Sequence, residues 1–324
     1  MSDGPDNDPP ARWRHVADFA KRRGWLLRVA DRLGRGRGAF RFDAWLPYLA
    51  RVKRPSLAGW SSSRLSAIAI GHATVLLRIG GATVLTDPVL STRIGLGAGV
   101  LTLGPRRRFP PALTIAQLPK LDLLLVSHAH FDHLDRPSLL RLPHATPVIT
   151  ARRTRDLIDG LGYRDVRELS WGQSLRLDGL TVTAVACRHW SPRVFADEHR
   201  GYNAYLLEAD GLRVLFAGDT AFHPGFASLA PLDLAIVGIS AYEPFIEAHA
   251  TPEQAYLMTK LARARFVMPM HHGVFRLSRE PMDEPLRRFL AAVTPSGPVP
   301  VALRPGERWD LPVSPTGQSV IPTK

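Results

Sequence analysis

Residues 121–135 read Leu-Asp-Leu-Leu-Leu-Val-Ser-His-Ala-His-Phe-Asp-His-Leu-Asp, an apolar run that leads straight into three histidines and an aspartate. The run 121–126 has the near-continuous hydrophobicity of a short strand buried on both faces. Four candidate metal ligands would leave the end of that strand together: His128, His130, Asp132 and His133. Zinc and its first-row neighbours bind imidazole and carboxylate groups, so this stretch predicts a metal site at a sheet edge rather than a solvated histidine-rich loop.

Three further candidate ligands come directly after other apolar strand patterns. They are His189 after residues 180–186, Asp219 after residues 214–217, and His271 after residues 266–270. Each one alone would more often be a capping or turn residue, but together with the first cluster they predict one common site. The doubled histidine at 271 and 272 leaves a choice of ligand, and we choose His271 because it directly follows the strand.

On these residues the sequence resembles the metallo-β-lactamase superfamily, whose signature is His-x-His-x-Asp-His followed by a His, an Asp and a final His at strand ends. The resemblance implies an α/β fold, the four-layer αβ/βα sandwich, with a site for two divalent metal ions at one edge. Zinc is the expected metal, with manganese or iron as alternatives. The implied ligands are His128, His130 and His189 for one ion, Asp132, His133 and His271 for the other, and Asp219 as the bridge.

Finer motifs resemble one branch, the N-acylphosphatidylethanolamine-hydrolysing phospholipase D group and its bacterial relatives. The matching segments are Gly-His-Ala-Thr at 71–74, Leu-Thr-Asp-Pro-Val at 85–89, Gly-Pro-Arg-Arg at 104–107, His-Trp at 189–190 with Arg193, Ala-Gly-Asp-Thr at 217–220, Ala-Tyr-Glu-Pro at 241–244 and Thr-Pro-Glu-Gln-Ala at 251–255. The aspartate at 219 stands where lactam-hydrolysing members with two zinc ions typically carry a cysteine, which argues for a phosphodiesterase. Segments 199–202 and 271–275 depart from the branch's pattern without removing a ligand.

The expected chemistry follows from the two metals. Divalent ions about 3.5 to 4 Å apart share a water and lower its pKa, giving a bridging hydroxide that attacks a phosphoryl or carbonyl group. We therefore expect a metal-dependent hydrolase, a phosphodiesterase of the phospholipase D type. A lactonase or carboxylic ester hydrolase is the alternative, because the same hydroxide attacks a carbonyl. A nuclease is less favoured, since no long insertion separates the ligand motifs.

Supporting residues are expected around the ligands. Asp87 follows the strand pattern 82–86 and is expected to orient a metal-bound imidazole, although an Asp-Pro turn would explain it equally well. We expect Asp132, Asp219 and His249 to be the catalytic residues. His249 precedes a helix-capping box that begins at Thr251. His72 is expected to be structural. Substrate contacts are expected from Trp190, Arg193 and Tyr242.

Composition places these motifs in a soluble enzyme. With 324 residues, 45% of them hydrophobic, the chain can bury a sizeable core as one catalytic domain, which we place at residues 61–324. The single cysteine, Cys187, excludes an intramolecular disulfide framework and fits a reducing compartment. No signal peptide and no membrane-spanning run is visible, so we expect a cytoplasmic location.

The N-terminal segment, residues 1–60, is a basic extension. Its stretch 11–42 is rich in arginine and carries apolar residues at loosely helical spacing, so it either lies on an anionic membrane surface or packs on the domain. The formal net charge of +13 favours an anionic partner, and we expect an anionic small-molecule or phospholipid substrate. Binding of nucleic acid is not expected, and the oligomeric state is left open.

Overall fold

The computed structural model describes residues 52–97, 102–190, 192–193 and 200–312. The predicted extension 1–60 therefore lies outside the described residues except for its last part, and the basic stretch 11–42 lies outside them entirely. At the start of the described chain, Trp60 is buried against the first sheet and donates its indole N–H to Thr83 Oγ1 at 3.3 Å. The domain boundary at residue 61 stays a prediction.

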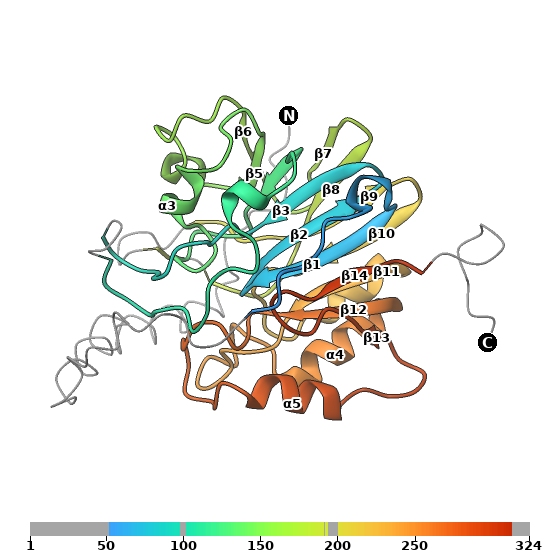
Figure 1. Cartoon of the computed structure of the whole chain (residues 1–324). Coiled ribbons are helices and arrows are strands. Elements are labelled where there is room, and N and C mark those ends of the chain that lie inside the picture. Colours follow the sequence, from blue (N-terminus) through green and yellow to red (C-terminus); the bar gives the residue numbers. More distant parts are fainter. Residues whose placement is uncertain (1–51, 98–101, 191, 194–199, 313–324) are drawn as a thin grey trace, which may run out of the picture.

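Two mixed sheets face each other in the described part of the chain (Figure 1). The first sheet is antiparallel at one side and parallel from β3 to β6. Its strands, in spatial order, are β14 (Arg308–Asp310), β1 (Leu65–Gly71), β2 (Thr74–Ile79), β3 (Ala82–Thr86), β4 (Leu123–Leu125), β5 (Val148–Ala151) and β6 (Val166–Leu169).

The second sheet repeats this arrangement. It is antiparallel from β7 to β10 and parallel from β10 to β13. Its strands, in spatial order, are β13 (Val299–Pro300), β12 (Ala264–Met270), β11 (Leu232–Gly238), β10 (Leu212–Phe216), β9 (Ala204–Ala209), β8 (Leu180–Val185) and β7 (Ser174–Leu177). The strand patterns that precede the candidate ligands therefore fold as predicted, as β4, β8, β10 and β12.

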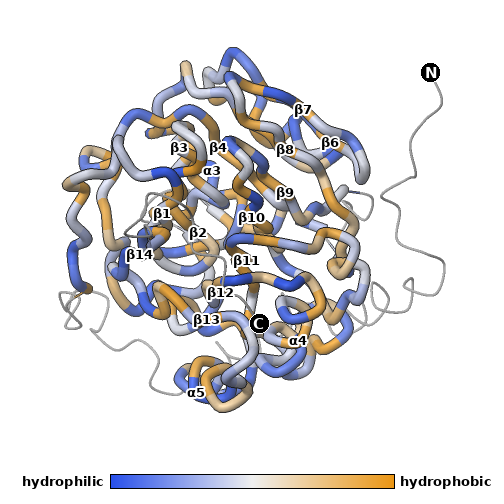
Figure 2. Tube along the Cα trace, turned by 90° about the vertical axis from the view of Figure 1, so that its right-hand side faces the viewer, coloured by the Kyte–Doolittle hydropathy of each residue, from blue (hydrophilic) through white to orange (hydrophobic). Residues whose placement is uncertain are grey.

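Helices and turns cover the outer faces of the two sheets. The α-helices are α3 (Arg136–Leu139), α4 (Pro252–Leu261) and α5 (Glu284–Ala291), and the 3₁₀ turns are η3 (Trp60–Ser62), η5 (Ile115–Gln117), η6 (Arg155–Leu157) and η7 (Pro224–Leu229). Helix α4 begins with the predicted capping box, in which Thr251 and Gln254 satisfy each other's backbone N–H groups. In Figure 2 apolar and polar residues lie side by side along α5, as expected of an amphipathic surface helix.

Three apolar layers hold the elements together. The central layer lies between the sheets and includes the fully buried Tyr205 and Phe216. A second layer joins α4 and α5 to the outer face of the second sheet, with Phe289 at its centre, and a third packs Leu139 and its neighbours on the first sheet. This layering confirms the predicted four-layer αβ/βα sandwich.

The parallel strands of both sheets end at the same edge. The segment 127–135 follows β4, and Asp219 and His271 follow β10 and β12. Two bonds tie the first of these segments to the opposite sheet: the Tyr205 hydroxyl donates to the Val126 carbonyl at 3.0 Å, and the Asn203 N–H donates to the Ser127 carbonyl at 3.0 Å. Each ligand-bearing segment is thus anchored to a rigid strand.

Gly218 makes the turn after β10 possible. Its φ of 56° lies in the left-handed region, and an added Cβ would approach Ser127 Cβ to 2.9 Å and the Asn203 carbonyl oxygen to 3.0 Å. Only glycine fits this close approach of three segments without displacing one of them. The turn delivers the next residue, Asp219, to the edge where the sheets meet.

Within the described part of the chain, every helix is too short or too polar to cross a lipid bilayer.

Candidate metal centre

Three histidines from two strand ends converge at this edge. His128 and His130 follow β4 and His189 follows β8, and we call them the three-histidine group. His128 Nε2 lies 2.9 Å from His130 Nδ1, and His189 Nε2 lies 3.3 Å from the same atom. Imidazole nitrogens this close together point at one centre, which is the arrangement of ligands around a metal ion.

The other ring nitrogens of this group have partners that orient the rings. His128 Nδ1 lies 2.9 Å from Ser127 Oγ, and His189 Nδ1 lies 3.0 Å from the Ala248 carbonyl oxygen. Because a carbonyl only accepts, His189 donates from Nδ1 and keeps a lone pair at Nε2. Burial lowers the pKa of His130 to about 3 and that of His189 to about 4, so both imidazoles are neutral, as metal binding requires.

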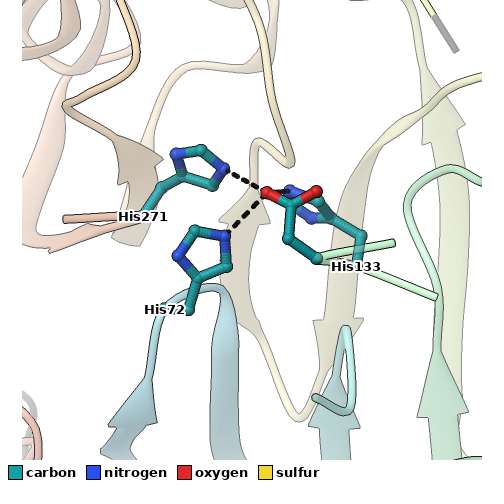
Figure 3. Close-up of side chains that lie close together, drawn as sticks. His72, His133 and His271 are labelled. Atoms are coloured by element: carbon teal, nitrogen blue, oxygen red, sulfur yellow. Dashed lines mark hydrogen bonds and ion pairs between the residues drawn. The ribbon is translucent and has the colours of Figure 1, made fainter. Parts of the chain in front are cut away.

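A second group of side chains lies beside the first (Figure 3). We call it the mixed group: His72, Asp132, His133 and His271. Asp132 Oδ2 lies 2.9 Å from His72 Nε2, 3.2 Å from His271 Nε2 and 3.5 Å from His133 Nε2. Burial would raise the pKa of Asp132, but the charge of His133 and the hydrogen bonds from the histidines hold it well below its ordinary value. The carboxylate is therefore ionised and able to bind a cation.

Asp87 lies where the sequence predicts it, behind a histidine of the mixed group. Its carboxylate is fully buried and accepts from His133 Nδ1 at 2.6 Å and from the backbone N–H and hydroxyl of Ser127, both at 2.7 Å. This bond fixes the His133 proton on Nδ1 and turns Nε2 toward the centre. Its role in metal binding stays a prediction.

The centre carries a negative potential. Burial would lower the pKa of His133, but the carboxylates of Asp219, Asp132 and Asp87 outweigh burial and raise it well above its ordinary value. A position that favours a proton so strongly also favours a metal cation, because both are stabilised by the same carboxylates.

Asp219 lies between the two groups. Its Oδ2 is 3.1 Å from both His133 Nε2 and His271 Nε2, and it is 3.9 Å from His189 Nε2 and 4.0 Å from His128 Nε2. Burial would raise the pKa of Asp219, but the neighbouring charges of His133 and His271 hold it well below its ordinary value. One ionised oxygen thus faces imidazoles of both groups.

The donor set fits divalent first-row metal ions. All its members are imidazoles or carboxylates, which are hard or borderline ligands. His133 Nε2 and Asp219 Oδ1 are buried and have no hydrogen-bond partner among the described residues. Buried polar atoms without partners are costly, and a metal ion would satisfy them. Of the two adjacent histidines, His271 belongs to the mixed group and His272 does not, which agrees with the choice of His271 as the candidate ligand.

Two of the predicted catalytic and substrate residues border the cluster. His249 forms a further possible metal-binding group with His189 and Asp219, with its Nδ1 3.8 Å from Asp219 Oδ2 and its ring centroid 5.0 Å from that of His189. The Trp190 ring meets His130 edge to face at 5.0 Å, and its buried indole N–H has no hydrogen-bond partner among the described residues. Both side chains lie beside the cluster, and their roles in catalysis and substrate binding stay predictions.

Arg193 supports the ligand-bearing segment. Its Nη1 donates to the carbonyls of Ala129 and Leu134 at 2.7 and 2.9 Å, and its guanidinium covers the Phe131 ring at 4.1 Å. These contacts close the loop 129–134, which carries two of the histidines. The contact with substrate that the sequence predicts for Arg193 stays a prediction.

The Tyr242 side chain contacts two residues of α5. Its hydroxyl donates to Glu284 Oε1 at 2.8 Å, and the Arg288 guanidinium covers its ring at 4.9 Å. It belongs to none of the metal-binding groups among the described residues. Its predicted contact with substrate stays a prediction.

His72 is expected from the sequence to be structural, yet the structure brings its imidazole into the mixed group. Burial, together with the charge of His271, lowers the pKa of His72 to about 3. The available signal was a Gly-His pair directly after the strand pattern of β1, in the position that the other ligands occupy after their strands.

Two packed mixed sheets with a histidine- and aspartate-rich centre at one edge define a metallohydrolase of the metallo-β-lactamase fold. Comparison with protein families agrees, because residues 82–272 match the model of the beta-lactamase superfamily domain. A solved structure of a possible metal-dependent hydrolase from Veillonella parvula is similar in fold, with a TM-score of 0.62 at 20% identity, covering 77% of this chain and 100% of that one.

Proteins that are similar in sequence include two whose names describe hydrolases. A protein of Mycobacterium tuberculosis named only as uncharacterized is 34% identical over 277 residues, covering 81% of this chain and 72% of its own length. An N-acyl-phosphatidylethanolamine-hydrolyzing phospholipase D of Caenorhabditis elegans is 33% identical over 250 residues, 69% of each chain. A metal-dependent hydrolase of Rubrobacter xylanophilus is 30% identical over 219 residues, 64% of this chain and 81% of its own.

The chain therefore belongs to the metallo-β-lactamase superfamily, and it is a metal-dependent hydrolase.

Replacing Asp87 with Asn should weaken metal binding while the fold is kept. Asn tolerates the left-handed backbone at this position, where φ is 31°, and its carbonyl still accepts from Ser127. Its amide would donate to His133 Nδ1, which moves the histidine proton to Nε2 and blocks the ligand. We expect a loss of about 10- to 100-fold in metal affinity, measured by competition with a chromophoric chelator.

Asp122→Asn is the matched control. Asp122 accepts a backbone N–H from Thr83 at 2.9 Å in the same sheet and belongs to none of the metal-binding groups among the described residues. Asp87→Asn protein with the metal affinity of Asp122→Asn would contradict the orienting role of Asp87.

Proposed function

We propose that the protein is a dinuclear metal-dependent phosphodiesterase of the phospholipase D type. The observation that carries this proposal is the position of Asp219, whose Oδ2 lies within 4.0 Å of imidazole nitrogens of both groups. A carboxylate so placed can bridge two ions, each held by its own set of ligands.

The proposed ligands follow from the two groups. The three-histidine group would hold one ion, Asp132, His133 and His271 would hold the other, and Asp219 would bridge them. A set of imidazole and carboxylate ligands suits zinc, and the same set can also bind manganese or iron. When bound, two such ions lower the pKa of a shared water and stabilise the charge that develops on the attacked phosphoryl oxygen.

The residues around the ligands would then act on the substrate. We assign His249 to catalysis, because its side chain is next to Asp219 and keeps 12% of its surface exposed, enough to meet a substrate. A neutral imidazole there can exchange a proton with the leaving group or hold the attacking water. Trp190 would donate its indole N–H, which has no partner in the part of the chain that the structure describes, to the substrate beside His130.

Two observations support the proposed substrate class: sequence similarity to a phospholipase D and the positive net charge of the chain. One relative is an N-acyl-phosphatidylethanolamine-hydrolyzing phospholipase D, and this chain carries a formal net charge of +13. A basic enzyme attracts an anionic phosphodiester and the anionic lipid surface that contains it. We therefore propose an amphiphilic or small anionic phosphodiester as substrate, with peripheral membrane contact through the basic N-terminal segment and a cytoplasmic location.

Reconstitution with Zn²⁺ should give metal-dependent cleavage of N-acylphosphatidylethanolamine and bis(p-nitrophenyl) phosphate, both assayed beside an acyl-homoserine lactone. Chelation should abolish the activity, and Asp132→Ala should lower it by more than ~100-fold because the mixed group loses its carboxylate. Opening of the lactone without cleavage of either phosphodiester would contradict the phosphodiesterase and favour the lactonase alternative, which uses the same ligands.

His249→Ala should lower kcat by about 100-fold while both metal ions remain bound, because the histidine acts on the substrate and not as a ligand. Turnover and metal content are measured on the same preparation. His144→Ala is the control, since His144 bonds the Leu140 carbonyl and belongs to none of the metal-binding groups among the described residues. An unchanged kcat for His249→Ala would remove His249 from the catalytic residues.

A further inference from the structure

His72 is the member of the mixed group that no metal assignment uses. It stands in the turn between β1 and β2, and its side chain is 1% exposed. Figure 3 shows its imidazole beside that of His271. Its Nε2 lies 2.9 Å from Asp132 Oδ2. Its contact with Asp132 Oδ2 is shorter than those of His271 and His133 with the same oxygen.

The backbone holds His72 in an unfavourable conformation. Its φ of 63° lies in the left-handed region, which is unfavourable for a residue with a side chain. The His72 carbonyl accepts the backbone N–H of His271 at 3.1 Å, so the ends of β1 and β12 are joined directly behind the cluster. Strain of this kind persists where the surroundings enforce it, and it gathers at functional sites.

Hydrogen bonding decides which nitrogen carries the proton. His72 Nδ1 is buried and has no hydrogen-bond partner among the described residues, whereas Nε2 faces an ionised carboxylate oxygen. A proton on Nδ1 would have no acceptor, and a lone pair on Nε2 would face the lone pairs of Asp132. The proton therefore lies on Nε2, which donates to Asp132 Oδ2.

Packing alone does not account for this side chain. The His72 ring lies 4.0 Å from the ring of His271 and meets Phe275 edge to face at 5.2 Å. An apolar ring would make the same contacts without burying an unsatisfied nitrogen, which costs free energy. The feature that only histidine supplies here is the Nε2–H donor to Asp132.

We propose that His72 is a positioning residue for the mixed group: its hydrogen bond to Oδ2 holds the Asp132 carboxylate in the orientation that binds a metal ion with His133 and His271. This inference rests on the proposed dinuclear function. Asp132 lies on a loop and its side chain is 13% exposed, so without this donor its carboxylate keeps only the longer contacts with His271 and His133. Contacts of this kind commonly affect metal affinity by 10- to 100-fold.

Cobalt titration of the full-length apoprotein tests the proposal through the two stepwise dissociation constants, read from the Co²⁺ absorption bands. His72→Phe keeps a ring and removes the donor, whereas His72→Gln keeps an N–H near the position of Nε2. We expect His72→Phe to raise the dissociation constant of one of the two ions by about 10- to 100-fold and to leave that of the other unchanged. His72→Gln should restore the affinity to within about threefold, with thermal melts confirming that each variant is folded.

A double-mutant cycle shows whether His72 acts through Asp132. The effect of His72→Phe should be much smaller in an Asp132→Asn background, because the acceptor that His72 positions is already altered. His144→Ala serves as the control for loss of a histidine elsewhere. Equal effects of His72→Phe in both backgrounds would overturn the proposal, and so would a His72→Phe protein that binds both ions as tightly as the wild type.

Failure of the proposed function gives a different result. A wild-type chain that takes up a single Co²⁺ would contradict the dinuclear phosphodiesterase. In that case weaker binding of the single ion by His72→Phe would still support the positioning role, and unchanged binding would overturn it.

Discussion

Burial of the Asp219 carboxylate among imidazoles is the constraint on which the rest of the centre depends. An ionised carboxylate removed from water is strongly destabilising unless positive charge or hydrogen bonds compensate it. The histidines within 4.0 Å of its Oδ2 come from both sheets: His128, His133, His189, His249 and His271. Each sheet alone would leave this carboxylate only partly compensated, so the site exists only where the two sheets are packed together.

The fold meets this constraint with rigid supports behind several of the inward-facing nitrogens. The parallel strands end at one edge, and short turns such as that at Gly218 deliver the ligands there. Hydrogen-bond acceptors on the side of a ring that faces away from the centre then fix the orientation of that ring. The Asp87 carboxylate does so for His133, and the Ala248 carbonyl does so for His189. Orientation is thereby set before any metal binds, which lowers the cost of assembling the site.

Local patterns in the sequence predicted the strands, the capping box at Thr251 and the places of the ligands. These features depend on neighbours a few residues apart, and Asp87 was found because it follows a strand in the same way as the ligands do. The surroundings of His72, Arg193 and Tyr242 could not be predicted, because their partners lie 60, 64 and 42 residues away along the chain. Such contacts are decided by how loops pack across the sheet edge, and no periodicity in the sequence encodes that.

Anomalous diffraction at the zinc edge, on crystals grown with Zn²⁺, would locate the metal ions. We expect two anomalous peaks per chain, about 3.5 to 4 Å apart, on either side of the Asp219 carboxylate. One peak should lie within bonding distance of the three-histidine group and the other within bonding distance of Asp132, His133 and His271. A single peak, or two peaks that Asp219 does not join, would contradict the account.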